Sequence, residues 1–120
     1  DFNMMLYFKC DTPDLGQFDT PDKMAASVRE GSAQYLPYIE EKEIVLKPAP
    51  VDPMYGFLTV LTDAEEAQKE NHAPGQFKYM TRGMVRLSQD TALGFSLMTN
   101  DTDSPEYLKL LNYIYSFVWR

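Results

Sequence analysis

The stretch QFKYMTRGMVRLSQDTALGFSLMTNDTDSPEYLKLLNYIYSFVW, residues 76–119, decides the fold of this chain. Apolar and polar side chains alternate through residues 76–87 and again through residues 93–99, which is typical of β-strands with two different faces. A short polar turn around Asp90 separates the two runs, so we predict a β-hairpin. Gly83 interrupts the first run, and this position predicts a bulge or bend in the strand.

The end of the same stretch predicts an amphipathic helix. Asp103 or Ser104 is a suitable N-cap, Pro105 is tolerated in the first turn, and Glu106 completes a capping-box-like arrangement with Asp103. Large apolar side chains then recur at helical spacing, at Tyr107, Leu110, Leu111, Ile114, Phe117 and Val118. Because an apolar stripe of this kind needs a surface to cover, we expect the helix to pack on the sheet.

The first part of the chain predicts a strand followed by a second helix. A short apolar run over residues 2–9 indicates the opening strand. Thr20 is a good N-cap and Pro21 suits the first helical position, so a helix is expected to begin there. This helix should end near Leu36, because the proline that follows disfavours helical geometry in the residue before it.

The middle of the chain completes the expected order of elements. Three prolines make residues 44–53 an edge strand or a rigid extended crossover, and residues 55–61 form the next strand. Residues 63–75 are polar and predict a helical turn with an exposed loop. The resulting order, β-α-β-β-β-β-α, predicts an α+β fold: a two-layer sandwich in which both helices pack on one face of a mainly antiparallel sheet.

Composition limits the range of functions. The 120 residues are 44% hydrophobic, which suits one domain over residues 1–120. The net charge of -7 disfavours binding to nucleic acids and to anionic lipids, and it has two interpretations: solubility, or attraction of a basic protein partner. No apolar run approaches the roughly 18 residues that a membrane helix needs. Because the sequence starts at Asp1 without a methionine, export after removal of a signal peptide and a fragment of a longer chain both stay open.

Signatures of catalysis are sparse. Cys10 is the only cysteine, so the chain forms no intramolecular disulfide and no zinc site built from several cysteines. His72 is the only histidine and therefore the natural general base, but no second histidine stands at the spacing of a metal-binding helix. No nucleophile elbow, phosphate-binding loop or dinucleotide fingerprint occurs. We therefore predict a non-enzymatic protein without a cofactor, with a hydrolase using His72 as an alternative.

The turn before the last helix is rich in side-chain oxygen atoms. Asn100, Asp101, Asp103 and Glu106 fall within seven residues, a density that suits a hard cation such as Ca²⁺. The spacing lacks the glycine and the bidentate glutamate of a twelve-residue calcium loop. Turn formation and helix capping explain the same residues, so two interpretations follow: a structural turn, or a metal site formed by Asp101, Asp103 and Glu106.

Partner binding is expected at acidic and aromatic side chains. Acidic residues gather in two segments, and the predicted contacts there are Glu40, Glu41, Glu43, Asp63, Glu65, Glu66 and Glu70. Tyrosine and tryptophan supply much of the binding energy where they are exposed at interfaces. The aromatic anchors predicted to be exposed, near prolines or the chain end, are Tyr38, Tyr55 and Trp119.

A family resemblance supports the same interpretation. Residues 93–118, LGFSLMTNDTDSPEYLKLLNYIYSFV with its terminal Ser116-Phe117 pair, resemble the end of PsbP/DcrB-type domains, in which a last strand leads into a helix that ends similarly. The element order is similar over most of the chain, whereas the proline-rich residues 47–53 do not match. The resemblance implies a non-enzymatic domain that binds a protein partner, often in exported or secretion-related settings.

Together these observations predict a non-catalytic protein-binding domain with an acidic, tyrosine-bearing surface. A bacterial immunity protein, an inhibitor or a secretion accessory would fit this description. The alternative from another class is an exported domain that binds a small ligand or Ca²⁺.

Overall fold

A computed structural model describes the backbone of residues 4–11 and residues 20–73, 75–89 and 91–118 in full. The elements follow the predicted order β-α-β-β-β-β-α, with two additional short 3-10 turns. In chain order they are β1 (Met4–Asp11), α1 (Pro21–Ala33), η2 (Leu36–Tyr38), β2 (Lys47–Pro48), β3 (Gly56–Thr62), η3 (Glu66–Gln68), β4 (Tyr79–Arg86), β5 (Ala92–Thr99) and α2 (Pro105–Tyr115).

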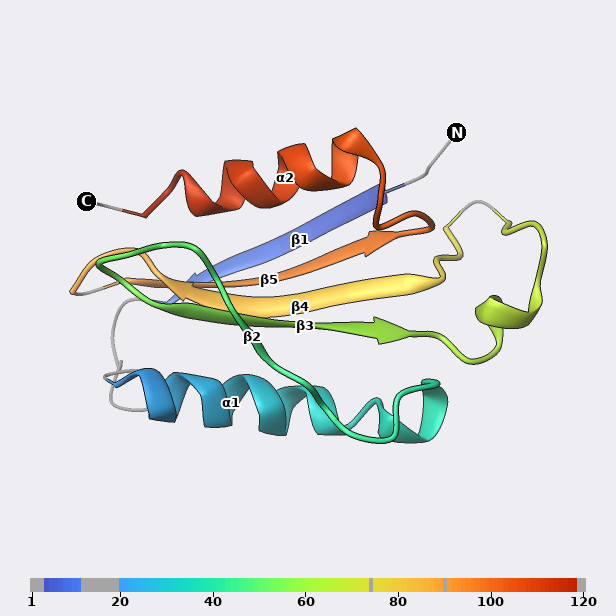
Figure 1. The fold of residues 1–120 in the computed structure, drawn as a ribbon, viewed down its shortest axis with the longest axis horizontal. Helices are drawn as coiled ribbons and strands as arrows, with labels where there is room; N and C mark the ends of the chain where they lie inside the picture. The colour runs from blue at the N-terminus through green and yellow to red at the C-terminus, as the bar shows by residue number, and fades with distance from the viewer. Residues whose placement is uncertain (1–3, 12–19, 74, 90, 119–120) are drawn as a thin grey trace.

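The strands form one antiparallel sheet in the order β1-β5-β4-β3-β2 (Figure 1). The predicted hairpin of β4 and β5 is confirmed, and its register runs from Tyr79 opposite Thr99 to Arg86 opposite Ala92. Gly83 does not mark a bulge, as its position predicted. It pairs with Leu58 on one side and Phe95 on the other in an unbroken register.

The α+β class and the mainly antiparallel sheet are confirmed, but the two helices lie on opposite faces of the sheet (Figure 1). Thr81 Oγ1 lies 2.6 Å from the Tyr107 hydroxyl of α2, whereas the next residue, Arg82, donates from Nη1 to the Gly31 carbonyl of α1 at 2.5 Å. Successive side chains of a strand point to opposite faces. The expectation of two layers with both helices on one face was therefore wrong, because the central strands carry side chains that need cover on both sides.

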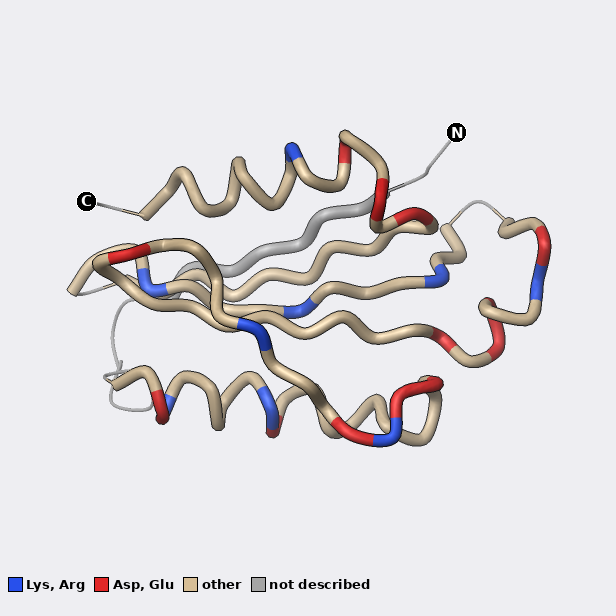
Figure 2. The backbone as a smooth tube through the Cα atoms, viewed as in Figure 1, with Lys and Arg blue, Asp and Glu red and all other residues tan. Residues whose placement is uncertain are grey.

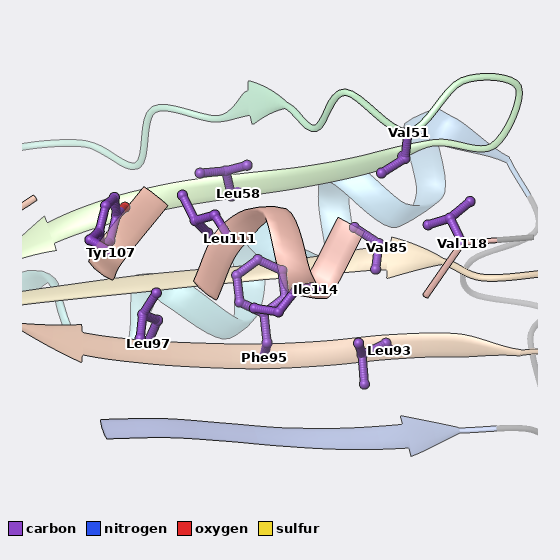
Figure 3. Packing of buried hydrophobic residues seen from close by; sticks show 10 residues of the cluster. All are labelled: Val51, Leu58, Val85, Leu93, Phe95, Leu97, Tyr107, Leu111, Ile114 and Val118. Atoms are coloured by element: carbon purple, nitrogen blue, oxygen red, sulfur yellow. The ribbon is translucent and has the colours of Figure 1, made fainter. Parts of the chain in front are cut away.

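The main core lies between the sheet and α2 (Figure 3). Ile114 and Leu97 are fully buried, and burial of such a side chain contributes about 1.5–3 kcal/mol. The proline-rich crossover also enters this core through Val51, which is fully buried. The cluster consists of Val51, Leu58, Val85, Leu93, Phe95, Leu97, Tyr107, Leu111, Ile114 and Val118. The predicted apolar stripe of the last helix thus covers the sheet as expected.

A smaller cluster lies on the α1 face of the sheet. Met24 is completely buried there, with Phe57 and Met84 packed against it. The Thr20 hydroxyl accepts a hydrogen bond from the Lys23 amide at 3.2 Å, which confirms the predicted N-cap. The helix ends at Ala33, earlier than predicted, and the chain continues into η2. None of the helices in the described part of the chain is long and apolar enough to cross a membrane.

Candidate functional site: the acidic end of the sheet

One end of the sheet collects the acidic segments of the chain. β3 ends at Thr62, β4 begins at Tyr79 and β5 ends at Thr99, and these three residues are direct neighbours across the strands. The acidic residues 63–70 follow β3 and the acidic residues 101–106 follow β5. Both segments therefore leave the sheet at the same end, although they lie far apart in the sequence.

A third acidic segment, residues 40–43, is fastened to this end by backbone pairing. Ile39 and Asp63 form an isolated antiparallel bridge, and the Glu40 amide donates to the Thr62 carbonyl at 2.9 Å. The Glu41 carboxylate also accepts from Thr62, from the amide at 2.7 Å and from the hydroxyl at 2.8 Å. These contacts bring the two predicted partner-binding segments side by side.

We call the resulting surface the acidic end, and Figure 2 shows the backbone positions of its acidic residues, in red, around one end of the molecule. Its lysines, Lys42, Lys69 and Lys78, are fewer than its acidic residues. Because negative charges outnumber positive ones here, this end carries a negative field that attracts cationic groups. The acidic residues are Glu40, Glu41, Glu43, Asp63, Glu65, Glu66, Glu70, Asp101, Asp103 and Glu106.

The predicted contacts differ in their availability. Among the predicted acidic contacts, Glu40, Glu43, Glu65 and Glu70 are exposed. The predicted anchor Tyr38 stands among them with 68% of its surface exposed. The acidic end therefore presents carboxylates around an accessible tyrosine.

Glu66 is not available to a partner, contrary to its predicted role at the surface. It is only 4% exposed, and its carboxylate accepts from Lys69 Nζ at 2.7 Å and contacts His72 Nδ1 at 2.9 Å. The hydrogen bond from Lys69, followed by that from His72, holds the pKa of the Glu66 carboxyl below its usual value. Glu66 thus organises the 66–72 loop and does not extend into solvent.

The same contacts change the description of His72. Its side chain is only 14% exposed, so it is not a freely solvated loop residue. A carboxylate beside an imidazole is also an arrangement that orients a general base. The hydrolase alternative therefore stays a prediction, and loss of any measured hydrolysis in His72→Ala with unchanged thermal unfolding would support it.

The other two predicted aromatic anchors do not join this surface. Tyr55 is half-buried, its hydroxyl accepts from Arg86 Nη1 at 2.6 Å, and the Arg86 guanidinium lies 5.7 Å from the ring centroid. The expectation that Tyr55 is exposed was therefore wrong, because its ring and hydroxyl are both used within the fold. Trp119 lies outside the described residues.

Asp101, one of the predicted metal ligands, stabilises the turn before α2. Asp101 Oδ1 accepts from the Asp103 amide at 2.9 Å, and the Ser104 hydroxyl caps α2 by accepting from the Tyr107 amide at 3.2 Å. Within the described ranges, no three or more histidine, cysteine, aspartate or glutamate side chains are grouped so that they hold a metal ion. Calcium binding by Asp101, Asp103 and Glu106 therefore stays a prediction, and a calcium titration followed by thermal unfolding tests it.

A cleft of about 300 Å³ opens beside Tyr38 at the acidic end. Leu61, Met80 and Met98 are direct neighbours on three adjacent strands, so they form one row of apolar side chains in it. The complete lining is Tyr35, Tyr38, Ile39, Leu61, Asp63, Gly75, Gln76, Phe77, Lys78, Tyr79, Met80 and Met98. The cleft could not be foreseen from the sequence because its residues come from four separate segments of the chain.

The walls of the cleft are held by polar contacts. Asn100 Oδ1 accepts from the Lys78 amide at 2.7 Å, and Asn100 Nδ2 donates to the Gln76 carbonyl at 3.3 Å, which ties the loop before β4 to the end of β5. On the opposite wall, the Arg82 guanidinium lies 5.1 Å from the centroid of the Tyr35 ring. The Asn100 side chain therefore positions a wall of the cleft, and its hydrogen bonds account for its orientation without a bound cation.

Comparisons with protein-family models, with curated proteins and with solved structures find no match for this chain. The resemblance of residues 93–118 to PsbP/DcrB-type domains therefore stays a prediction.

Proposed function

We propose that this chain is a non-catalytic protein-binding domain that engages a basic partner through the acidic end. The observation that carries the proposal is the convergence of three acidic segments, 40–43, 63–70 and 101–106, at one end of the sheet, with the exposed ring of Tyr38 beside the first two. Backbone pairing imposes this arrangement, since Ile39 and Asp63 form a bridge. The fold thus concentrates negative charge at one end.

Such a surface favours association with a cationic protein in two ways. Its field increases the rate of encounter with a basic surface, and the effect weakens as salt screens the charges. Tyr38 supplies a large, exposed contact with little loss of side-chain entropy, as tyrosine does at many interfaces. A bacterial immunity protein, an inhibitor and a secretion accessory all remain compatible with this mode of binding.

The test begins with capture of partners from the source cell, followed by association kinetics with the purified partner. We expect a basic partner whose association rate falls as salt rises. The double variant Glu40→Lys/Glu65→Lys should associate at least about tenfold more slowly at low salt. Both positions are exposed, so the variant should keep the wild-type thermal unfolding midpoint.

Asp22→Lys provides a control for net charge, because Asp22 is exposed in the first turn of α1, away from the acidic end. It should leave the association rate nearly unchanged. An association rate that is insensitive to salt and to the double reversal would refute the proposal. Asp22→Lys reverses one charge and the double variant reverses two, so a control effect half as large on a logarithmic scale would also refute the proposal, because the rate would then depend on total charge only.

A further inference from the structure

The cleft beside Tyr38 has the dimensions of a site for one side chain. Its volume of about 300 Å³ lies at the lower limit for small-molecule pockets, which range from about 300 to 1,000 Å³. The apolar row of Leu61, Met80 and Met98 offers a surface to an aliphatic stem. Methionine side chains adapt to the shape of what they contact, and two of these three residues are methionines.

Asp63 lines the cleft, and its carboxylate is held in a fixed orientation. Its Oδ1 atom accepts from the amides of Glu65 and Glu66, both at 2.9 Å. Among the described residues, no hydrogen-bond donor contacts the other oxygen, Oδ2. The carboxylate is therefore held by the η3 turn and retains an oxygen for a ligand.

The aromatic walls favour a cation of a particular shape. Tyr35 already has the Arg82 guanidinium 5.1 Å from its centroid, and Tyr79 has the Lys78 ammonium at the same distance from its own. Tyr38 and Phe77 also line the cleft, and no cation contacts either ring in the described part of the chain. Aromatic faces attract cations, and guanidinium groups stack on them better than ammonium groups because they are planar and less strongly hydrated.

Resting on the function proposed above, we propose that this cleft binds an arginine side chain of the basic partner. The aliphatic stem lies on the apolar row, the guanidinium contacts the rings of Tyr38 and Phe77, and it donates to Asp63 Oδ2. The carboxylates of the neighbouring segments 40–43 and 63–70 outnumber the nearby cations Lys78 and Arg82, so the site as a whole favours a cation. Arginine is preferred to lysine because its planar fork suits both the rings and the carboxylate.

A peptide titration followed by NMR tests the site without the natural partner. The probe is a blocked glycine-serine peptide with one central arginine, titrated into the isotope-labelled chain. We expect saturable shifts at Tyr38, Asp63, Phe77 and Tyr79. The same peptide with citrulline, a neutral analogue of arginine with nearly the same shape, should bind at least about tenfold more weakly, as should the lysine peptide.

The matched variants are Asp63→Asn and Asp101→Asn. Each removes one charge from the acidic end, and an asparagine keeps the oxygen that accepts the local backbone hydrogen bonds of either aspartate. Only Asp63 lines the cleft. Asp63→Asn should weaken the arginine peptide about tenfold, whereas Asp101→Asn should change its affinity less than twofold.

Equal binding of the arginine and citrulline peptides would overturn the proposal, and so would equal effects of the two variants. Tyr38→Ala gives an independent test, because Tyr38 is exposed and its truncation should not unfold the chain. Unchanged peptide affinity in Tyr38→Ala would also count against the site.

The two proposals can fail separately. If the arginine peptide does not bind, but the association rate of the partner still depends on salt and on Glu40→Lys/Glu65→Lys, only the arginine site is refuted. If the arginine peptide binds, but the association rate changes neither with salt nor in Glu40→Lys/Glu65→Lys, only the proposed function is refuted.

Discussion

The Phe95 ring occupies the space into which a side chain at Gly83 would project. The two residues are paired across β4 and β5, and a Cβ atom at position 83 would lie 2.7 Å from Phe95 Cζ. It would also lie 2.7 Å from the Phe57 carbonyl oxygen, which belongs to the backbone and cannot rotate away. Phe95 is part of the main core (Figure 3), so the glycine is needed for packing and not for an unusual backbone conformation.

Gly83→Ala should therefore destabilise the protein by about 1–3 kcal/mol, the usual effect of forcing extra atoms into a packed core. Equilibrium unfolding in urea measures the change. Gly31→Ala is the matched control, because its Cβ would lie 3.7 Å from the nearest Arg82 nitrogen, an ordinary contact distance. That variant should stabilise the protein by about 0.5–1 kcal/mol through better helix propensity. Equal stability of the two variants would contradict the packing role of Gly83.

The buried hydrogen bond between Thr81 and Tyr107 should contribute to stability through coupling of the two residues. Their oxygen atoms are 2.6 Å apart, and Thr81 and Tyr107 are 0% and 4% exposed. Thr81→Val or Tyr107→Phe alone leaves a buried hydroxyl without its partner and should cost about 1–3 kcal/mol. The double variant should cost less than the sum of the single losses. Additive losses in urea unfolding would show that the pair does not act as a unit.

Alkaline pH should destabilise the protein because burial raises the pKa of Tyr107 and of Tyr115, both in α2. Burial is the main cause for both, and it raises the pKa of Tyr115 to about 12. In the unfolded chain these groups ionise near the ordinary tyrosine pKa of about 10, while the folded protein keeps them protonated. Their contribution to stability is complete below that pH and is lost as the pH rises toward 12.

Thermal unfolding as a function of pH measures this loss, and tyrosinate absorbance follows ionisation directly. Tyr115→Phe removes one of the two groups, so its thermal unfolding midpoint should fall less steeply with rising pH than that of the wild type. If the midpoint of Tyr115→Phe falls as steeply with pH as that of the wild type, Tyr115 does not cause the alkaline destabilisation.

Acid should destabilise the protein, because protonation of Glu66 weakens its contacts in the 66–72 loop. Its pKa is lowered mainly by the hydrogen bond from Lys69, so the folded protein binds a proton there less readily than the unfolded chain does. The stability from this group is present above the ordinary value of 4.5 and is lost as the pH falls through the lower folded value. Glu66→Gln should therefore be less stable than wild type near neutral pH, and the difference should shrink in acid.

The measurement is the thermal midpoint of both proteins between about pH 7 and pH 3. Glu70→Gln is a suitable control, because Glu70 is exposed in the same loop. A constant difference between Glu66→Gln and wild type across this range would contradict the role of the charged form.

The elements with strong local signals were predictable from the sequence. Thr20 and Ser104 cap the two helices as their residue types and the following prolines indicate, and the hairpin of β4 and β5 follows from alternation around a short turn. These signals depend on contacts between residues that are close in the chain. The element order and the α+β class therefore required no knowledge of the tertiary structure.

The faces on which the helices lie were decided by the tertiary structure. Alternation tells which side chains of a strand share a face, but it does not assign a helix to that face. Thr81 and Arg82 are adjacent in the sequence, yet one contacts α2 and the other α1. Side chains on both sides of β4 needed cover, and only the packed chain shows which helix provides it.

The candidate site depends even more on long-range contacts. The sequence by itself determined that this chain has an excess of acidic residues in separate segments and a tyrosine beside a proline. Only the tertiary structure decided that the Ile39–Asp63 bridge and the shared end of β3 and β5 bring these segments together, and that Glu66 is turned inward by Lys69 and His72. The physical reason is that charge and residue type are properties of single positions, whereas proximity and burial arise from pairing between residues distant in the chain.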